Sequence, residues 1–264
     1  MSNNNHHERI SESRFWQSLL KTYARSPSIA LCRVPELEYA AALPLDGVTL
    51  DHCCGDGLFA KMGWSTGKFS AGCDMNELSL KDAGRLGKHE RLDLCDAGKH
   101  LPYPDAHFDL VFDNSALEHI PDLQQSLREI ARVLKPRGIF AFNVLNHRYF
   151  EWWPMDTESM QAYREWQPFY HALSIEEWGK ELAAAGLEIE DLRGYFNREA
   201  ASTLAVLDYE FSGYYIRRRP SRLVSDYSSF LGLERRKWRQ RMGELSWRTE
   251  PDEGAGYFIT ARRL

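Results

Sequence analysis

Short apolar runs alternate with amphipathic stretches through the middle of the chain. The runs have the length of strands and cover residues 48–51, 69–74, 91–95, 108–113 and 139–144. Between them, residues 76–86 carry apolar positions at helical spacing, and a second such face follows Pro121, which we expect at the first position of its helix. Strands that alternate with helices form parallel βαβ units. The pattern therefore predicts an α/β fold with a doubly wound, mostly parallel sheet over about residues 46–145.

The flanking segments carry weaker patterns. Residues 11–24 show helical spacing until Ser26-Pro27-Ser28 interrupts it, and residues 28–43 form a moderately apolar connection without a predicted element. The first ten residues are polar and lack an apolar signal-peptide core, so we expect a disordered tail. Beyond the core, the sequence predicts a helix at 174–185 that opens with a capping box of Ser174 and Glu177, and strands at 187–195 and 256–262.

These patterns indicate one domain in three stretches. Residues 1–45 are expected to form the tail and an N-terminal helical cap, and residues 46–145 the core. Residues 146–264 are expected to complete the sheet in the same domain, with an aromatic-rich lid at 146–170 and a helical insertion at 197–254.

Composition narrows the class of protein. The 264 residues carry a net charge of −5, which argues against nucleic acid as a partner because such proteins usually have a basic excess. No apolar run approaches the roughly 20 residues that span a bilayer, so no transmembrane segment is predicted. The five cysteines are odd in number and include no CxxC pair. They favour reduced thiols in the cytoplasm and no metal site.

One segment departs from the acidic average. Nine Lys and Arg residues lie between 217 and 241, against Asp226 and Glu234. A solvated helical face, a site for a phosphate-bearing substrate, and peripheral contact with an anionic membrane surface all remain open for this segment. The basic residues are Arg217, Arg218, Arg219, Arg222, Arg235, Arg236, Lys237, Arg239 and Arg241.

Acidic residues end three successive predicted strands. Asp51 precedes a turn that contains Gly55 and Gly57, where glycine lets a ligand approach the backbone closely. Asp74 follows about 20 residues later, at the position where a carboxylate accepts hydrogen bonds from both ribose hydroxyls of an adenosine. Asp96 ends the third strand and could accept from an adenine amino group. The order predicts a nucleoside site at the carboxyl edge of the sheet.

In these residues the chain resembles the class I S-adenosylmethionine-dependent methyltransferases, in the branch with the methyltransferase type 11 pattern. The resemblance covers about residues 46 to 145. The residues that carry it are Leu50-Asp51-His52-Cys53-Cys54-Gly55-Asp56-Gly57, Gly72-Cys73-Asp74, Asp96-Ala97, Leu101-Pro102-Tyr103-Pro104-Asp105, Phe108-Asp109-Leu110-Val111, Leu117-Glu118-His119-Ile120 and Arg132-Val133-Leu134-Lys135-Pro136-Arg137-Gly138.

The resemblance implies a seven-stranded sheet in the order 3-2-1-4-5-7-6 with the last strand antiparallel. It implies S-adenosyl-L-methionine as the cofactor and S-adenosyl-L-homocysteine as its product. Asp51 would orient the glycine loop or the sulfonium end of the cofactor. The remaining implied contacts are the backbone of Cys53, Gly55 and Gly57 beside the methionine part, Asp74 on the ribose, Met75 on the adenine face, Asp96 with Ala97 at adenine N6, and Asn114 with Ser115 near the methionine part.

Two residues depart from the family pattern. Cys53 stands where the family usually has glycine, and we expect its backbone to keep a negative φ. Asp56 adds a negative charge near the carboxylate of the cofactor, so we expect its side chain to point to solvent or to a basic partner.

The reaction needs a general base only if the acceptor holds its proton tightly. His119 is the first candidate, because an imidazole titrates near neutrality. His147 and Tyr149 follow the fifth strand and are further candidates, although all three could instead serve packing or the loop.

We therefore expect methyl transfer to oxygen or nitrogen of a small molecule. A secondary metabolite and a sugar- or phosphate-bearing acceptor both fit, and the aromatic stretch could wall a pocket for a planar acceptor. The alternatives are an RNA or protein methyltransferase, which the acidic charge disfavours, and a non-catalytic scaffold that binds the cofactor. The sequence makes no prediction of the oligomeric state.

Overall fold

The computed structural model describes residues 8–217, 221–229 and 232–264. Most of the predicted tail lies outside this part, but Ile10 is fully buried and its backbone N–H donates to the Leu245 carbonyl at 2.8 Å, so the tail prediction is wrong at its end. The chain forms two compact units. The sheet unit comprises Tyr39–Asn146, Phe169–Arg193 and Tyr257–Leu264, and the helical unit comprises Met1–Glu38, His147–Pro168 and Gly194–Gly256.

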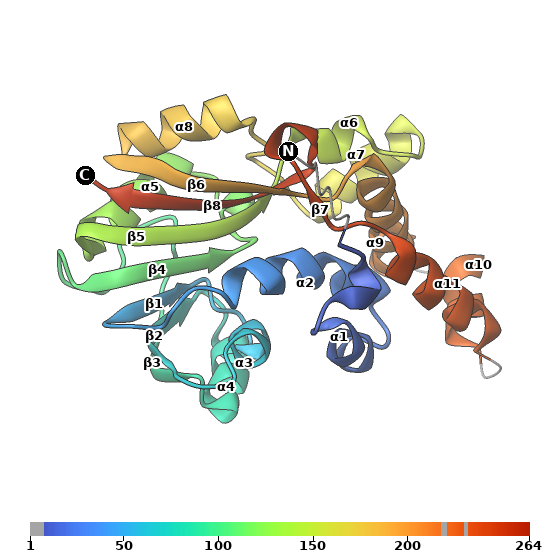
Figure 1. Ribbon diagram of the computed structural model, residues 1–264, viewed down its shortest axis with the longest axis horizontal. Coiled ribbons are helices and arrows are strands. Elements are labelled where there is room, and N and C mark those ends of the chain that lie inside the picture. Colours follow the sequence, from blue (N-terminus) through green and yellow to red (C-terminus); the bar gives the residue numbers. More distant parts are fainter. Residues whose placement is uncertain (1–7, 218–220, 230–231) are drawn as a thin grey trace, which may run out of the picture. The chain divides into compact units, whose positions relative to one another are not determined.

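The sheet has the predicted topology with one additional strand. Its order is β3-β2-β1-β4-β5-β8-β6-β7, and Figure 1 shows β8 running opposite to β4 and β5. The additional β7 has two residues, Arg248–Thr249, and pairs with Gly194 and Tyr195. Without it, the order equals the expected 3-2-1-4-5-7-6. The other strands are β1 (Thr49–His52), β2 (Phe69–Asp74), β3 (His89–Leu94), β4 (Phe108–Asn114), β5 (Leu134–Leu145), β6 (Leu187–Tyr195) and β8 (Gly256–Arg263).

Parallel pairing aligns the strand ends that matter for the site. Asp51 lies opposite Gly72 of β2, while His52 lies opposite Cys73 of β2 and Asp113 of β4. The apolar residues of β1, β2, β4 and β5 on one face pack in a core with α5 and α8. This buried core holds the carboxyl ends of the four strands side by side.

The helices of the sheet unit follow the predicted periodicity, with two corrections. Pro121 does not open its helix, because the Asp122 side chain caps it by accepting from the Gln125 N–H. The residues from Lys135 to Gly138 belong to β5 instead of a helix end: they lie at a register shift between Leu134 and Ile139, which both pair with β4. The helices are α3 (Leu58–Gly63), α4 (Glu77–Leu86), η2 (Leu117–His119), α5 (Leu123–Val133) and α8 (Ile175–Ala184), the last with the predicted capping box.

The helical unit contains the largest miss. Residues 27–40 form helix α2, because Pro27 lies at a helix start, where its missing N–H costs nothing, instead of ending the preceding element. The other elements of this unit are η1 (Ile10–Glu12), α1 (Trp16–Thr22), α6 (His147–Glu151), α7 (Thr157–Trp166), α9 (Arg198–Arg217), α10 (Arg222–Ser228), α11 (Leu233–Glu244) and η3 (Pro251–Glu253). Within the described residues, no helix combines the length and apolarity needed to cross a membrane.

Candidate functional site

The glycine turn after β1 is held in a left-handed conformation at three positions. Cys53, Gly55 and Gly57 have φ of 54°, 56° and 74°. The expectation of a negative φ for Cys53 is therefore wrong, and a residue with a Cβ takes up a conformation that glycine adopts more easily. The Cys54 N–H donates to the Cys73 carbonyl at 2.9 Å, which ties the turn to β2. A Cβ on Gly57 would lie 3.0 Å from Ala83 of α4, so this glycine also permits close packing.

Asp74 connects the glycine turn to the start of α4. One carboxylate oxygen accepts from the Gly55 N–H at 2.9 Å and the other from the Asn76 N–H at 2.8 Å. Each oxygen has a second lone pair, and the side chain is only partly buried, so it can accept further donors. Asp56 points to solvent as expected and accepts from the Leu58 N–H.

Two exposed apolar side chains lie at the same strand ends as the Asp74 carboxylate. Met75 follows Asp74 and is 73% exposed, and Leu94 at the end of β3 is 60% exposed. Large apolar side chains left in water next to a polar anchor are typical of a ligand-binding surface. A flat aromatic ring that covers them would gain burial there.

Asp96 lies just beyond β3 and keeps an ionised carboxylate. It accepts from the Gly98 N–H at 3.0 Å and pairs with Lys99 at 3.1 Å, and the Lys99 ammonium holds the pKa of Asp96 below its usual value. Ala97 is buried in the core next to it.

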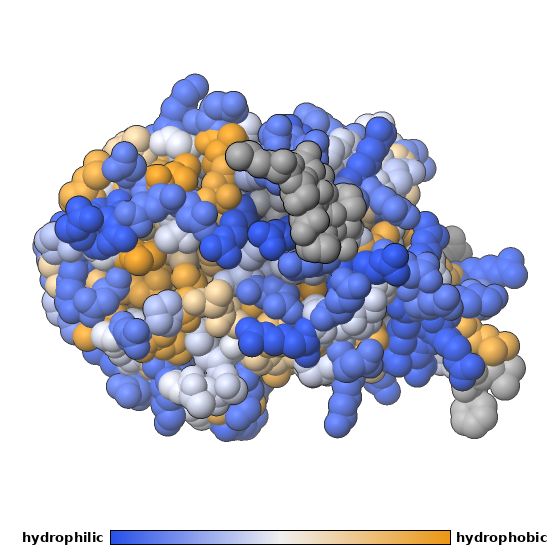
Figure 2. All heavy atoms as spheres, viewed as in Figure 1, coloured by the Kyte–Doolittle hydropathy of each residue, from blue (hydrophilic) through white to orange (hydrophobic). Residues whose placement is uncertain are grey.

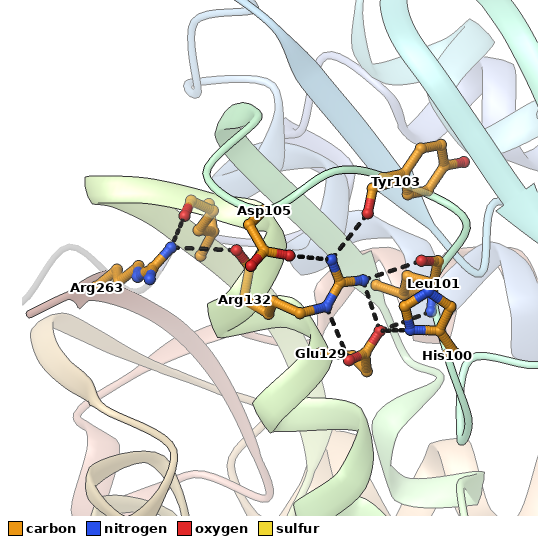
Figure 3. Close-up of polar contacts among 8 residues, drawn as sticks. His100, Leu101, Tyr103, Asp105, Glu129, Arg132 and Arg263 are labelled. Atoms are coloured by element: carbon orange, nitrogen blue, oxygen red, sulfur yellow. Dashed lines mark hydrogen bonds and ion pairs between the residues drawn. The ribbon is translucent and has the colours of Figure 1, made fainter.

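Arg132 anchors the loop that follows Asp96 (Figure 3). Its guanidinium donates to the carbonyls of Tyr103 at 2.8 Å and Leu101 at 3.0 Å, and to the Asp105 carboxylate at 2.6 Å. It also binds Glu129 through two nitrogens, at 2.9 and 2.7 Å, which lowers the pKa of Glu129. Planar five-donor geometry makes arginine suited to such a junction. The anchoring roles of Arg132 and Glu129 on the loop have no signal in the sequence other than their place on α5.

Two buried histidine–carboxylate pairs lie behind the turn. Asp51 accepts from His89 of β3 at 2.7 Å, and His52 contacts Asp113 at 2.7 Å. Burial raises the pKa of Asp51, and the His89 hydrogen bond opposes that rise. Within the described residues, the Asp51 carboxylate is hydrogen-bonded to His89 and not to the amides of the glycine loop. The sequence analysis did not identify His89, because the predicted third strand begins at residue 91, whereas β3 begins at His89.

The end of β4 turns sharply beside β5. Asn114 accepts from the Asn143 side chain at 2.9 Å, and the Ser115 N–H donates to the Asn143 carbonyl at 3.1 Å. Ser115 has a φ of 52°, which fixes the turn at this point. Both residues lie at the same edge of the sheet as Asp51 and Asp74, as their implied role requires.

The three candidate bases divide between the units. His119 ends η2 in the sheet unit, half-buried, with its ring 4.6 Å from that of Phe169. His147 and Tyr149 lie on α6 in the helical unit. His147 is 3.9 Å from Glu151, and Tyr149 is 1% exposed, with a pKa that burial raises.

The cysteines gather near the same edge without a disulfide. All five are free, and the thiols of Cys73 and Cys95 contact one another. His52, Cys53 and Asp113 have ligand-type atoms within 4.8 Å of one another. The hydrogen bond between His52 and Asp113 already accounts for that pair, so the three residues carry no separate argument for a metal.

Comparison with known proteins agrees with this geometry. Residues 50–142 match the family model described as a methyltransferase domain. A protein of Mycolicibacterium smegmatis named Probable S-adenosylmethionine-dependent methyltransferase is 30% identical over 179 residues, which is 67% of this chain and 65% of that protein. The 2-phytyl-1,4-naphtoquinone methyltransferase of Synechococcus elongatus is 36% identical over 140 residues, 48% of this chain and 56% of that protein.

A solved structure extends the likeness at the level of the fold. The structure of a geranyl diphosphate methyltransferase in complex with S-adenosylmethionine has a TM-score of 0.55 at 14% identity, covering 95% of this chain and 90% of that chain. The chain covers 65% and 56% of the lengths of the two curated relatives given above, which is less than two thirds in each case.

Proposed function

Because the chain carries a class I S-adenosylmethionine-dependent methyltransferase domain, whose cofactor is S-adenosylmethionine, we propose that it transfers a methyl group to an oxygen or nitrogen of a small molecule. The observation that carries the proposal is the carboxyl edge of the sheet. There a partly exposed Asp74 accepts from the Gly55 N–H of the glycine turn, and two exposed apolar residues lie next to it: Met75 follows β2, and Leu94 of β3 is opposite Asp74 in the sheet.

The residues of this edge fit the cofactor in chemistry. Asp74 has acceptor capacity left for ribose hydroxyls, and Asp96 has an ionised oxygen for the adenine amino group. Met75 and Leu94 offer apolar cover for the adenine ring. The left-handed turn from Cys53 to Gly57 exposes backbone for the methionine part, and Asn114 and Ser115 border it from β4.

When bound, the cofactor would supply a methyl group on a sulfonium. The acceptor atom would bond to that methyl carbon while the carbon–sulfur bond breaks and S-adenosylhomocysteine leaves. The chain therefore has to hold the acceptor in line and, where the acceptor keeps its proton, remove that proton. We assign this role first to His119, which shares the sheet unit with the cofactor residues. His147 remains the second candidate. Burial keeps the Tyr149 hydroxyl protonated near neutral pH, so it would donate a hydrogen bond instead of acting as a base.

The acceptor proposed here is small and has an aromatic or quinoid ring. The support is that a curated relative is named for a naphthoquinone. The free thiols fit the cytoplasmic location that we keep as part of the proposal.

Acceptor screening with methyl-labelled S-adenosylmethionine tests the proposal. The panel contains hydroquinones, catechols, aromatic amines, a tRNA mixture and a protein extract. Label transfer to a ring hydroxyl or amine is expected, and its loss in Asp74→Ala would link it to the site. Transfer to RNA or protein alone would contradict the small-molecule assignment. Tight binding of S-adenosylhomocysteine without any transfer would instead favour the non-catalytic scaffold.

A further inference from the structure

Helix α11 presents a basic stripe to solvent. Residues 233, 236, 237, 240, 241 and 244 are exposed and recur at the three- and four-residue spacing of one helical face. The stripe reads Leu233, Arg236, Lys237, Gln240, Arg241 and Glu244, so three cations lie along it between an apolar start and an acidic end. The opposite side is buried at Met242 and Gly243. The helix is therefore docked on one side and charged on the other.

The basic side chains on the exposed face form no hydrogen bond or ion pair outside α11 within the described residues. The Arg236 side chain has neither, the Arg241 guanidinium lies over the Trp238 ring, and Lys237 pairs with Glu234 at 2.6 Å, an exposed contact that contributes little stability. The other two basic residues of α11, Arg235 and Arg239, instead donate to the backbone carbonyls of Tyr227 and Leu20. On the neighbouring α10, the Arg222 side chain is 95% exposed and lies 3.7 Å from Asp226. Figure 2 shows mostly hydrophilic residues over α10 and α11, with one small hydrophobic group among them.

The charge of this surface contrasts with that of the whole chain. Helix α11 carries five basic and two acidic residues, whereas the chain as a whole has a net charge of −5. A local basic surface on an acidic protein selects an anionic partner. Leu233, 57% exposed at the first turn, adds an apolar contact that a purely ionic partner would not use.

We propose that the exposed face of α11, with Arg222 of α10, docks the protein on an anionic lipid bilayer. Cationic side chains lie in the headgroup layer, and Leu233 enters the apolar boundary below it. A bilayer fits better than RNA because the stripe is short and carries an exposed apolar residue, Leu233, at its start. The proposal goes beyond the methyl-transfer function and does not depend on which acceptor is used.

Sedimentation with lipid vesicles tests the docking. The full chain is spun with vesicles of phosphatidylcholine alone or with 30% phosphatidylglycerol (about the anionic content that gives a strong surface potential). Binding to the anionic vesicles only, lost in high salt, is expected because screening removes surface attraction. Equal binding to both vesicle types, or none to either, would overturn the proposal.

Charge reversal locates the surface. Arg236→Glu with Lys237→Glu should weaken vesicle binding at least about thirtyfold, since each cation near an anionic surface contributes about 1 kcal/mol. The matched control, Lys61→Glu with Lys68→Glu, changes the net charge equally at two exposed lysines of the sheet unit and should bind nearly as wild type. If both double variants lose binding alike, the surface is not α11.

Two further readouts keep the result interpretable. Arg236→Gln with Lys237→Gln serves if the reversal variant does not fold, and it should still lose about tenfold or more. Affinity for S-adenosylhomocysteine should stay unchanged in all α11 variants, so failure of docking and failure of the methyltransferase proposal are separately visible. Binding of wild type to a synthetic RNA but not to vesicles would contradict the proposal in favour of nucleic acid.

Discussion

The sheet unit and the helical unit both bury carboxylates, but they assemble them differently. In the sheet unit, Asp113 of β4 meets His52 of the neighbouring β1, and Asp51 of β1 meets His89 of β3, two strands away in an order that follows from βαβ topology. In the helical unit, Asp208 of α9 accepts a hydrogen bond from Tyr163 of α7 at 2.5 Å, and Ser28 of α2 adds another. Those helices are far apart in sequence, and no periodicity brings them together.

The two kinds of partner have different electrostatic consequences. An imidazole can carry a positive charge and so oppose the rise that burial imposes on the pKa of Asp51. The hydroxyls around Asp208 remain neutral, and burial raises the pKa of Asp208 although their hydrogen bonds oppose that rise. Asp51 is therefore buried beside a group that can carry a charge, whereas the partners of Asp208 stay neutral.

The largest expected effect distinguishes the units by catalysis. His119→Gln should lower kcat by about 10²–10⁴, the usual contribution of a general base, and leave the affinity for S-adenosylhomocysteine within about twofold. Steady-state kinetics and calorimetry on the same preparations measure both. A greater loss of kcat in His147→Gln would move the base to the helical unit, and a parallel loss of affinity would make His119 part of the cofactor site.

The second prediction concerns Arg132, which anchors the loop after Asp96 in the sheet unit. Arg132→Met leaves the Glu129 carboxylate without its guanidinium and should lower the free energy of unfolding by about 3 kcal/mol. Arg132→Lys keeps the charge but loses the two-pronged contact, so it should recover only part of this. Denaturant unfolding measures both variants. Full recovery by lysine would show that charge alone holds the loop.

The smallest predicted effect is on stability as a function of pH: the contributions of Glu129 and Asp208 to the free energy of unfolding change in opposite directions as pH rises. Glu129 has a lowered pKa in the folded chain, so its stabilisation is present above its unfolded pKa of about 4 and is lost as pH falls through the folded value. Asp208 has a raised pKa, so folding favours its protonated form and its contribution falls as pH rises from about 4 through the folded value.

Neutral variants expose these slopes. Glu129→Gln should lose stability relative to wild type near neutrality and converge with it in acid. The stability of Asp208→Asn relative to wild type should be higher near neutrality than in acid. Unfolding curves between pH 3 and 7 (the window of about the two titrations) provide the test, and parallel shifts of the two variants would contradict the assignment of opposite slopes.

The sequence predicted the sheet unit well because its elements follow local rules. Strands β2 and β6 have the predicted bounds, since an apolar run between a turn and a helix leaves little choice of register. The expected cofactor residues Asp74, Met75 and Asp96 also lie at the predicted edge. Helix α2 was missed because the Ser26-Pro27-Ser28 segment that opens it looks like a loop and Pro35 lies inside it. The conformation of Cys53 was wrong because a strained turn is set by its surroundings and not by the residue in it.

The site is predictable only where residues close in sequence build it. Asp74 and Gly55 are recognisable because each follows a strand. His89 and Arg132 act through contacts made across the sheet and across a helix, at separations of 38 residues from Asp51 and 31 from Leu101. The polar cluster around Asp208 has no sequence signal for the same reason.

We infer that the carboxyl edge of the sheet, and not the helical unit, binds the cofactor. Calorimetric titration with S-adenosylhomocysteine compares wild type, Asp74→Asn and the chemically matched Asp208→Asn, with NAD as a negative control. We expect micromolar binding by wild type, a loss of about 1.5–3 kcal/mol for each charge-assisted hydrogen bond removed in Asp74→Asn, and no change in Asp208→Asn. Equal affinity of Asp74→Asn and wild type, or binding of NAD instead, would contradict it.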